Sequence, residues 1–227
     1  MKYSPELARS YSEKRETMSQ SDKPFVDALG DLGMKHKAVV DLGSGDGRHA
    51  RIMKEMGAEN VIGIDISEEM ITLARNKTTN ENVHFVVANG ENLPLSNESA
   101  DIVTSMYVIM YFKDTKKVFG EVARVLKSGG HFVGIFNITD IEPGFEHLEN
   151  TPMPVRLGKE SESIVVHNLI KTPQEIQSSI SESGLTILRK EEVSDPLSVV
   201  DDSFPDVSHV QKRATLFVLE KKSTADR

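Results

Sequence analysis

Short runs of apolar and β-branched residues recur along the first 137 residues of the chain. They occupy 38–42 (AVVDL), 60–65 (NVIGID), 83–88 (VHFVVA), 100–106 (ADIVTSM) and 131–137 (HFVGIFN). Continuous apolar runs of this length are typical of parallel strands that are buried on both faces. We therefore expect the five runs to form one sheet.

Helical patterns lie between several of these runs. In 49–56 the apolar residues fall at i, i+3, i+4 and i+7, which is one face of a helix. The hydroxyl of Ser67 can cap a second helix, and apolar positions within 118–126 mark a third. Near the N-terminus, 3–20 is charged and weakly helical, and 22–32 is predicted to be a helix that covers the edge of the sheet.

The pattern changes after the fifth run. Residues 138–162 are rich in proline and glycine and have no clean period, which predicts a loop or a lid. A strand-like run follows at 163–170, and 172–175 is a capping box with proline at the first helical position. The runs 185–193 and 213–221 are predicted to form an antiparallel pair.

Strands that alternate with helices and finish in an antiparallel pair indicate the fold class. We expect an α/β protein: a doubly wound, mostly parallel, seven-stranded sheet of Rossmann-like type with helices on both faces. An antiparallel strand pair near the C-terminus completes the sheet. The length of 227 residues fits a single domain.

Composition excludes several classes of protein. The chain has no cysteine, so it has no disulfide, no thiolate nucleophile and no cysteine-bound metal. The formal charge of −8, from 27 basic and 35 acidic residues, disfavours nucleic acid as a partner. Neither a signal-peptide core nor an apolar stretch of membrane-spanning length is present in the sequence, so we expect a cytoplasmic protein.

The segment 40–47 (VDLGSGDG) carries the clearest chemical signal. It is a predicted strand that ends in alternating glycines and runs directly into a helix. Glycine allows a positive φ and the close approach of a ligand, while the free N–H groups of a helix N-terminus attract an anion. A tight turn without a ligand would show the same glycines. Asp65, at the end of the next strand, can accept hydrogen bonds from both hydroxyls of a ribose, and this second feature favours a nucleotide site.

The spacing of the glycines narrows the choice of nucleotide. A dinucleotide fingerprint requires a third glycine at the position of Arg48, whereas Gly43, Gly45 and Gly47 complete a G-x-G-x-G pattern. No phosphate-binding lysine of the Walker type follows.

Together, DLGSGDG, the strand that ends at Asp65, NGENLPL and the run DIVTSMYVIMYFKD…EVARVLKSGGHFVGIF resemble the class I S-adenosylmethionine-dependent methyltransferases. The resemblance is to the small-molecule group that includes the ubiquinone/menaquinone C-methyltransferases, and it covers about 37–137. It implies S-adenosyl-L-methionine as cofactor and S-adenosyl-L-homocysteine as product.

We predict a single methyltransferase domain over 1–227 that is divided into four parts. The expected parts are an N-terminal cap or lid with its helix (1–32), a cofactor-binding half (37–137), a lid insertion (138–162) and a C-terminal substrate-side half (163–227). We expect residues 1–20 and 138–162 to assemble the lid.

The cofactor residues follow by resemblance from the family's motifs. Gly43, Ser44, Gly45 and Gly47 would wrap the methionine part of the cofactor, and Asp41 would orient the loop and the amino group. The α-carboxylate would lie near the helix expected to begin at Asp46.

The second strand and those after it would bind the remainder of the cofactor. Asp65 would bind the ribose and Ile66 would lie against the adenine. Asn89 stands where the family typically has an aspartate for the adenine amino group, and its oxygen can still accept that bond. Gly90 and Glu91 would complete the adenine wall, and Ser105 and Met106 would line the methyl group.

Methyl transfer from a sulfonium is an in-line displacement that proximity and orientation can accelerate, without a covalent intermediate. Aromatic faces attract a sulfonium by cation–π interaction, so Tyr107, Tyr111, Phe112 and above all Tyr11 are candidates. Ordinary packing with a solvated hydroxyl is the alternative for each tyrosine.

Methylation of a phenol or carboxylate oxygen can require a general base. His147 and His167, in or after the lid region, titrate near neutral pH and are candidates, with ordinary surface placement as the alternative. His131 is expected in the core, and we assign no role to the other four histidines, His36, His49, His84 and His209. We expect no metal site, because the acidic cluster within 191–206 lacks the spacing of a calcium loop.

The predicted function is methyl transfer to an oxygen, nitrogen or carbon atom of a small-molecule acceptor. Residues 104–107 (Thr-Ser-Met-Tyr) lack the Asn/Asp-Pro-Pro-aromatic signature of enzymes that methylate the amino groups of nucleic acids. Alternatives are methylation of a protein or tRNA, a non-catalytic S-adenosylmethionine-binding protein, and a dinucleotide-binding module, which the residue Arg48 opposes. We expect a monomer or a homodimer.

Overall fold

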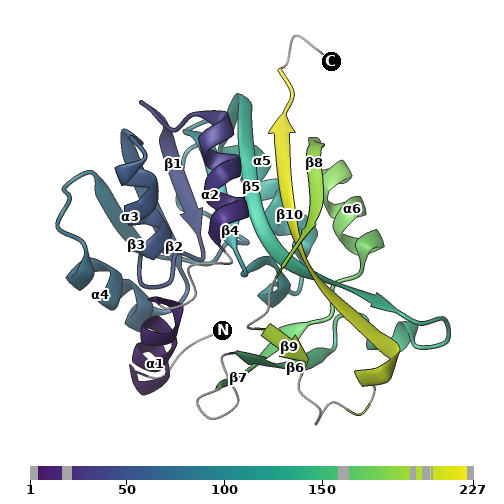
Figure 1. The fold of residues 1–227 in the computed structure, drawn as a ribbon. Helices are drawn as coiled ribbons and strands as arrows, with labels where there is room; N and C mark the ends of the chain where they lie inside the picture. The colour runs from purple at the N-terminus through teal and green to yellow at the C-terminus, as the bar shows by residue number, and fades with distance from the viewer. Residues whose placement is uncertain are drawn as a thin grey trace.

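The computed structural model describes residues 5–16, 22–157, 164–194, 198–200, 205 and 207–223. Seven strands form one sheet in the order β3-β2-β1-β4-β5-β10-β8 (Figure 1). Their bounds are β1 (Ala38–Leu42), β2 (Asn60–Asp65), β3 (Val83–Val87), β4 (Ala100–Met106), β5 (Leu126–Ile141), β8 (Leu185–Val193) and β10 (Val210–Lys221). β1 to β5 pair in parallel, and β10 is antiparallel to both β5 and β8. The predicted fold class is confirmed.

Six α-helices accompany the sheet in the described part of the chain. They are α1 (Pro5–Glu16), α2 (Lys23–Leu32), α3 (Arg48–Glu55), α4 (Glu68–Lys77), α5 (Thr115–Val125) and α6 (Pro173–Glu182). Figure 1 shows α2 and α5 on opposite faces of the sheet. Because α2 contacts β5 and β10, which are interior strands, the prediction that it covers the sheet edge is wrong.

The helix caps follow the sequence signals. The Ser67 Oγ accepts a hydrogen bond of 3.3 Å from the N–H of Met70, and the Thr172 Oγ1 accepts one of 3.2 Å from the N–H of Glu175. Only half of the predicted capping box forms, because the Glu175 carboxylate bonds to other side chains.

No helix of the described residues is long and apolar enough to cross a bilayer.

Half of the described residues of the segment 138–162 lie in strands, so the prediction of a loop is wrong for those residues. Its first four residues continue β5, because β10 pairs with β5 as far as Ile141 and supplies the hydrogen bonds. β6 (Pro152–Leu157) then joins a second sheet of order β7-β6-β9, with β7 (Ile164–Leu169) and β9 (Ser198–Val200). Residues 158–162 lie outside the described residues.

Tertiary pairing explains why the prolines of β6 did not prevent a strand. Pro152 and Pro154 lie in the part of β6 that pairs with β7 alone, while β9 pairs only with residues 155–157. Proline is tolerated where a strand has no hydrogen-bonded neighbour on one side. The lid role expected for this region stays a prediction.

The main core fills both faces of the large sheet. Phe119 of α5 packs edge-on against Phe132 of β5, and Phe136 stacks on Phe217 of β10 at 4.8 Å between centroids. A separate small cluster, comprising Leu148, Met153, Val155, Val166 and Ile170, lies under the second sheet. The rigid large sheet thus fixes the strand ends from which the site is built.

Candidate cofactor site

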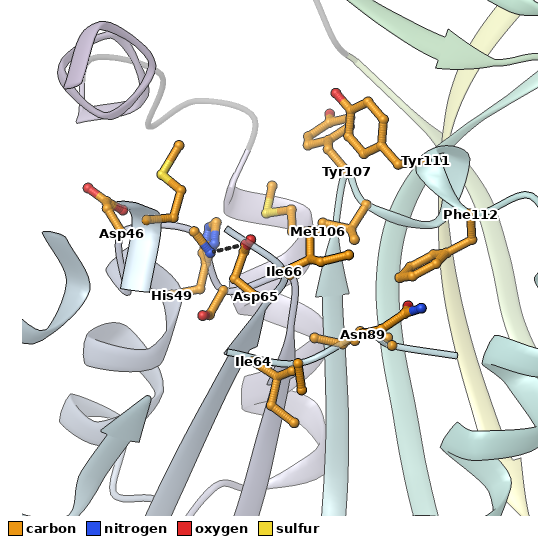
Figure 2. Close-up of a pocket in the computed structure, with 18 of the residues that line it drawn as sticks. Asp46, His49, Ile64, Asp65, Ile66, Asn89, Met106, Tyr107, Tyr111 and Phe112 are labelled. Carbon is orange, nitrogen blue, oxygen red and sulfur yellow. Dashed lines mark hydrogen bonds between the residues drawn. The ribbon is translucent and has the colours of Figure 1, made fainter. Parts of the chain in front are cut away.

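A cavity of about 260 Å³ lies at the carboxyl ends of β1, β2 and β4 (Figure 2). Its lining residues are Tyr11, 42–46, Arg48, His49, 64–66, Met70, 88–91, 106–108 and 111–113. Ligands of open α/β sheets bind at this edge, where successive crossovers leave a crevice. The predicted location of the site therefore coincides with a real hollow.

The turn after β1 is held by its backbone. The N–H groups of Gly43 and Ser44 both donate to the carbonyl oxygen of Ile64, at 2.7 and 2.9 Å. Gly43 has a φ of 74°, and a Cβ there would lie 2.2 Å from Val108 Cγ2, so packing alone requires glycine at this position. Gly45 has a φ of 54°, but no atom lies within 4 Å of the position of its Cβ. The space next to Gly45 is therefore open to a ligand.

Gly47 serves packing rather than the cavity. It precedes α3 with a φ of 79°, and a Cβ there would come within 2.5 Å of the Phe85 ring. Gly47 is not among the described residues that line the cavity. The helix begins at Arg48, two residues later than the expected start at Asp46.

The Asp65 carboxylate joins the glycine turn to the end of β2. Its Oδ2 accepts a hydrogen bond from the N–H of Gly45, and its Oδ1 accepts one from the N–H of Ser67, both at 2.9 Å. Burial raises the pKa of Asp65 above its ordinary value, and these backbone donors offset only part of that effect. Each carboxylate oxygen keeps a further lone pair for a ligand hydroxyl.

A second carboxylate, Asp46, ties the N-terminal helix to the turn. Its Oδ2 accepts hydrogen bonds from the Ser12 hydroxyl of α1 at 2.5 Å and from Lys77 Nζ of α4 at 2.9 Å. Burial opposes ionisation, but these two donors outweigh it and hold the pKa of Asp46 below its ordinary value. The anchor places the neighbouring Tyr11 at the cavity.

The residues expected around the adenine all line the cavity. They are Ile66, Asn89, Gly90 and Glu91. The Asn89 Oδ1 accepts a hydrogen bond of 3.1 Å from the N–H of Glu91, which orients the amide. Figure 2 shows Asn89 below Phe112 and across from Asp65.

Aromatic residues after β4 form another wall. Tyr107, Tyr111 and Phe112 line the cavity together with Tyr11. Tyr107 has a φ of 56°, an unfavourable value for a side chain with a Cβ, and its N–H donates to the carbonyl oxygen of Ile135 at 2.6 Å. Backbone strain of this kind persists where the surrounding structure fixes it, often beside functional sites.

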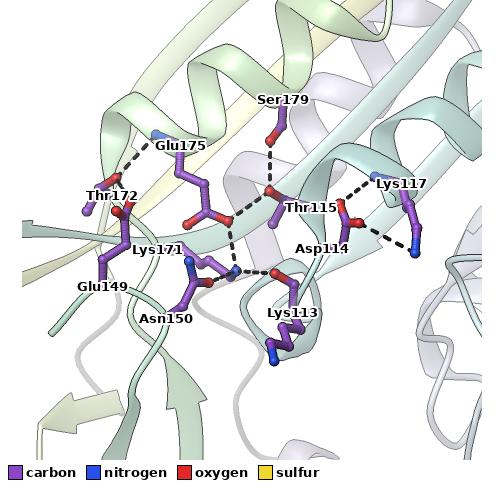
Figure 3. Close-up of polar contacts among 10 residues, drawn as sticks. All are labelled: Lys113, Asp114, Thr115, Lys117, Glu149, Asn150, Lys171, Thr172, Glu175 and Ser179. Carbon is purple, nitrogen blue, oxygen red and sulfur yellow. Dashed lines mark hydrogen bonds and ion pairs between the residues drawn. The ribbon is translucent and has the colours of Figure 1, made fainter. Parts of the chain in front are cut away.

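The buried Lys171 holds the cavity wall at Lys113, the residue after Phe112 (Figure 3). Lys171 is 0% exposed, and its Nζ donates to Asn150 Oδ1, to Glu175 Oε1 at 2.8 Å and to the carbonyl oxygen of Lys113 at 3.3 Å. Glu175 Oε1 also accepts a hydrogen bond of 2.9 Å from the Thr115 hydroxyl. We call Lys113, Asn150, Lys171 and Glu175 the Lys171 cluster. It joins the cavity wall to α6 and to the segment before β6.

Most predicted site residues line the cavity, but five do not. Those at the cavity are Tyr11, Gly43, Ser44, Gly45, Asp65, Ile66, Asn89, Gly90, Glu91, Met106, Tyr107 and Tyr111. The described lining leaves out Asp41, Gly47, Ser105, His147 and His167.

Asp41 and Ser105 are buried beneath the cavity. The Asp41 Oδ1 accepts a hydrogen bond of 2.9 Å from the Thr104 hydroxyl, and burial raises the pKa of this carboxyl. Ser105 is fully buried within β4, on the face opposite to Met106. Asp41 is therefore placed to support the turn, and the structure does not support Ser105 as a lining residue for the methyl group.

The two candidate bases lie elsewhere. His147 belongs to the short 3₁₀ helix η3 (Glu146–Leu148), with its ring 6.1 Å from that of Phe145. His167 is an exposed residue of β7, paired with Pro154. Their catalytic role stays a prediction that this placement does not favour. His131, expected in the core, is only half-buried.

Sequence reasoning missed two cavity residues at the start of α3. Arg48 pairs with Asp22, and His49 Nε2 lies 3.4 Å from Asp22 Oδ1, with the imidazole edge-on to Phe25. Burial raises the pKa of Asp22, but the bonds to His49 and the charge of Arg48 outweigh this and lower it. Their position in the sequence could have indicated a place at the cavity, because both residues directly follow the glycine turn. Among the described residues, no group of three or more acidic or histidine side chains is arranged to hold a metal ion.

The fold and the turn are typical of nucleotide-binding α/β proteins, and comparison with known proteins shows which family this part of the chain resembles. Residues 40–134 match the family described as "Methyltransferase domain". This segment is less than half of the chain, and over it the chain is similar to the class I S-adenosylmethionine-dependent methyltransferases, a family whose cofactor is S-adenosylmethionine.

Two relatives and one solved structure illustrate the similarity. The chain is 31% identical over 148 residues to the uncharacterized methyltransferase YcgJ of Bacillus subtilis, covering 60% of this chain and 58% of that one. It is 36% identical to the ubiquinone/menaquinone biosynthesis C-methyltransferase UbiE of Vibrio vulnificus, covering 42% and 39%. A putative S-adenosylmethionine-dependent methyltransferase of Listeria monocytogenes has the same fold, with a TM-score of 0.62, 21% identity and 84% and 93% coverage. The chain spans less than two thirds of the length of these curated relatives.

Proposed function

We propose that this chain transfers a methyl group from S-adenosylmethionine to an oxygen, nitrogen or carbon atom of a small-molecule acceptor. The observation that carries the proposal is the link between Asp65 and Gly45 beside open space in the cavity. A Cβ at Gly45 would fill that space, so the turn suits a ligand that lies directly on its backbone. The residues present fit the adenosyl-sulfur cofactor of the family.

The chain's own residues would hold the cofactor along the cavity. The turn 43–46 would face its methionine part, Asp65 its ribose hydroxyls, and Ile66 with 89–91 its adenine, and all of these residues line the cavity. Asp41 and Gly47 support the turn from beneath. A carboxylate with spare lone pairs and a hydrophobic side chain are the chemistry that a ribose and a purine ring require.

Held by the turn 43–46, Asp65 and the residues 89–91, S-adenosylmethionine would supply an electrophilic methyl group on a cationic sulfur. The aromatic walls of Tyr11, Tyr107 and Tyr111 favour positive charge and exclude water. Met106, at the end of β4, limits the space for the acceptor. Orientation in a dry cavity is the main source of rate in this mechanism.

A small acceptor is supported by the charge of the chain and by its relatives. The acidic balance disfavours tRNA, and the Vibrio vulnificus relative is named as a C-methyltransferase of ubiquinone/menaquinone biosynthesis. A protein acceptor and a non-catalytic binding role are the alternatives to be tested.

The first experiment is calorimetric titration with S-adenosylmethionine, S-adenosylhomocysteine and NAD in parallel, after removal of any co-purified ligand. Micromolar binding of the two adenosyl-sulfur ligands alone is the expected result, with formation of S-adenosylhomocysteine then measured against small acceptors and against protein and tRNA. Binding of NAD alone would overturn the proposal. Binding without turnover on any acceptor would favour the non-catalytic role.

A further inference from the structure

Asn137 lies on β5 two residues after Ile135, which pairs with the cavity residue Met106. Ile135 pairs with Met106 of β4 in parallel, and the carbonyl oxygen of Ile135 accepts the Tyr107 N–H. Side chains alternate along a strand, so Asn137 shares a face with Ile135 and Met106 and lies nearer the carboxyl edge of the sheet. Met106 and Tyr107 both line the cavity, as Figure 2 shows. Asn137 is therefore next to the place where an acceptor must approach the cofactor.

The amide of Asn137 is buried without any hydrogen bond. Asn137 is 3% exposed, and within the described chain neither Nδ2 nor Oδ1 has a partner. Its cross-strand neighbour Ala214 and Ile135 on the same face are apolar, and the buried Thr139, two residues further along β5, makes no hydrogen bond to the amide. An unsatisfied buried donor or acceptor costs about 1–3 kcal/mol, so a group from outside the chain is the expected explanation.

We propose that Asn137 binds the methyl acceptor through a hydroxyl group adjacent to the atom that receives the methyl. A hydroxyl accepts from Nδ2 and donates to Oδ1 at once, whereas a carboxylate or a hydrocarbon leaves at least one amide atom unpaired. Because Met106 and Ile135 are apolar, the remainder of the acceptor is apolar too. Asn137 is 3% exposed in this structure, so binding includes a movement of the side chains that cover it. This inference rests on the proposed methyl transfer.

The test replaces the amide with an apolar group of similar volume. Asn137→Leu should melt at or above the wild-type temperature, because it removes an unsatisfied group, and it should bind S-adenosylmethionine as wild type does. With catechol, which carries a hydroxyl beside the accepting oxygen, kcat/KM should fall by at least about tenfold. With phenol, which lacks that neighbour, kcat/KM should change little.

Asn168→Leu is the matched control, since Asn168 of β7 is also 3% exposed and its Oδ1 has no partner within the described residues. It should leave the catechol-to-phenol ratio unchanged, and an equal change in both variants would overturn the inference. A melting temperature several degrees lower for Asn137→Leu would overturn it as well, because it would indicate a structural amide bridged by water.

Binding separates failure of this inference from failure of the proposed function. If wild type methylates neither probe, calorimetry of catechol with the S-adenosylhomocysteine complex decides: weaker binding by Asn137→Leu supports the inference. Equal binding, or no binding by wild type, overturns it. Absence of any adenosyl-sulfur ligand binding by wild type would instead refute the proposed methyl transfer itself.

Discussion

The glycine turn and the Lys171 cluster both shape the same cavity, but they are held by different parts of the chain. In the turn, backbone N–H groups of Gly43, Ser44 and Gly45 donate to Ile64 and Asp65. In the Lys171 cluster, one fully buried ammonium holds three separate segments through its own side chain. Backbone bonds survive most side-chain changes, whereas a buried charge depends on every partner. The two walls should therefore differ in how strongly the loss of one side-chain partner destabilises them.

Lys171→Met should have the largest effect, a loss of about 3–5 kcal/mol in the free energy of unfolding, because it leaves the Glu175 carboxylate buried without its cation. Urea unfolding measures the loss. The double variant Lys171→Met/Glu175→Gln removes both charges and should recover part of the stability. A single variant as stable as wild type would show that the cluster does not hold the wall.

Gly43→Ala tests the turn by packing and should cost about 2–4 kcal/mol of stability, from left-handed backbone strain plus overpacking against Val108. Gly45→Ala is the matched control, since its Cβ meets nothing. It should cost only about 1–2 kcal/mol of stability from strain, while weakening S-adenosylmethionine binding in calorimetry. Equal stability losses in the two variants would contradict this division between packing and ligand space.

Asp65→Ala should weaken cofactor binding by about 1.5–3 kcal/mol, the range for hydrogen bonds to a charged group, and leave the fold intact. Titration calorimetry gives the affinity, and circular dichroism checks folding. Unchanged affinity in a folded variant would refute the ribose role of Asp65.

The smallest effect expected is the pH dependence of the two carboxylates, which should have opposite signs. The pKa of Asp46 is lowered in the folded state, so its stabilisation is present above the ordinary carboxyl pKa and is lost as pH falls through the folded value. The pKa of Asp65 is raised by burial, so protonation favours the folded state as pH falls through its folded value.

Asp46→Asn should cost about 1 kcal/mol at neutral pH, because asparagine keeps one acceptor oxygen. The difference from wild type should shrink in acid, as urea unfolding at several pH values would show. A difference that grows on acidification would contradict the lowered pKa of Asp46.

The turn and the sheet could be predicted because their determinants are local in the sequence. The residues of the turn are consecutive, and the strand before it and the helix after it each carry a period. The antiparallel pair of β8 and β10 could be predicted for the same reason. The extension of β5 to Ile141 could not be predicted, because β10, more than sixty residues further along the chain, supplies the hydrogen bonds.

The side-chain contacts of the site could not be predicted in the same way. Lys171 meets Asn150 and Lys113, which are 21 and 58 residues away, so no pattern near it indicates burial. His49 was assigned to a helix face by its period, which does not reveal that its ring also reaches the cavity. Asn137 ends an apolar run and reads as the polar end of a strand. Its lack of hydrogen-bond partners distinguishes Asn137 from an ordinary polar strand end, and this is seen only in the structure.

The bond between Ser12 and Asp46 has a kinetic consequence. Ser12 is next to Tyr11 on α1, and its hydroxyl donates to Asp46 and accepts a hydrogen bond from Lys77. A ligand that lies against Tyr11 is therefore confined by a helix that these two hydrogen bonds hold at the turn. The residence time of such a ligand should then depend on how often α1 detaches, not only on the ligand's own contacts. Cofactor exchange would become faster with any change that loosens α1, even where equilibrium affinity barely changes.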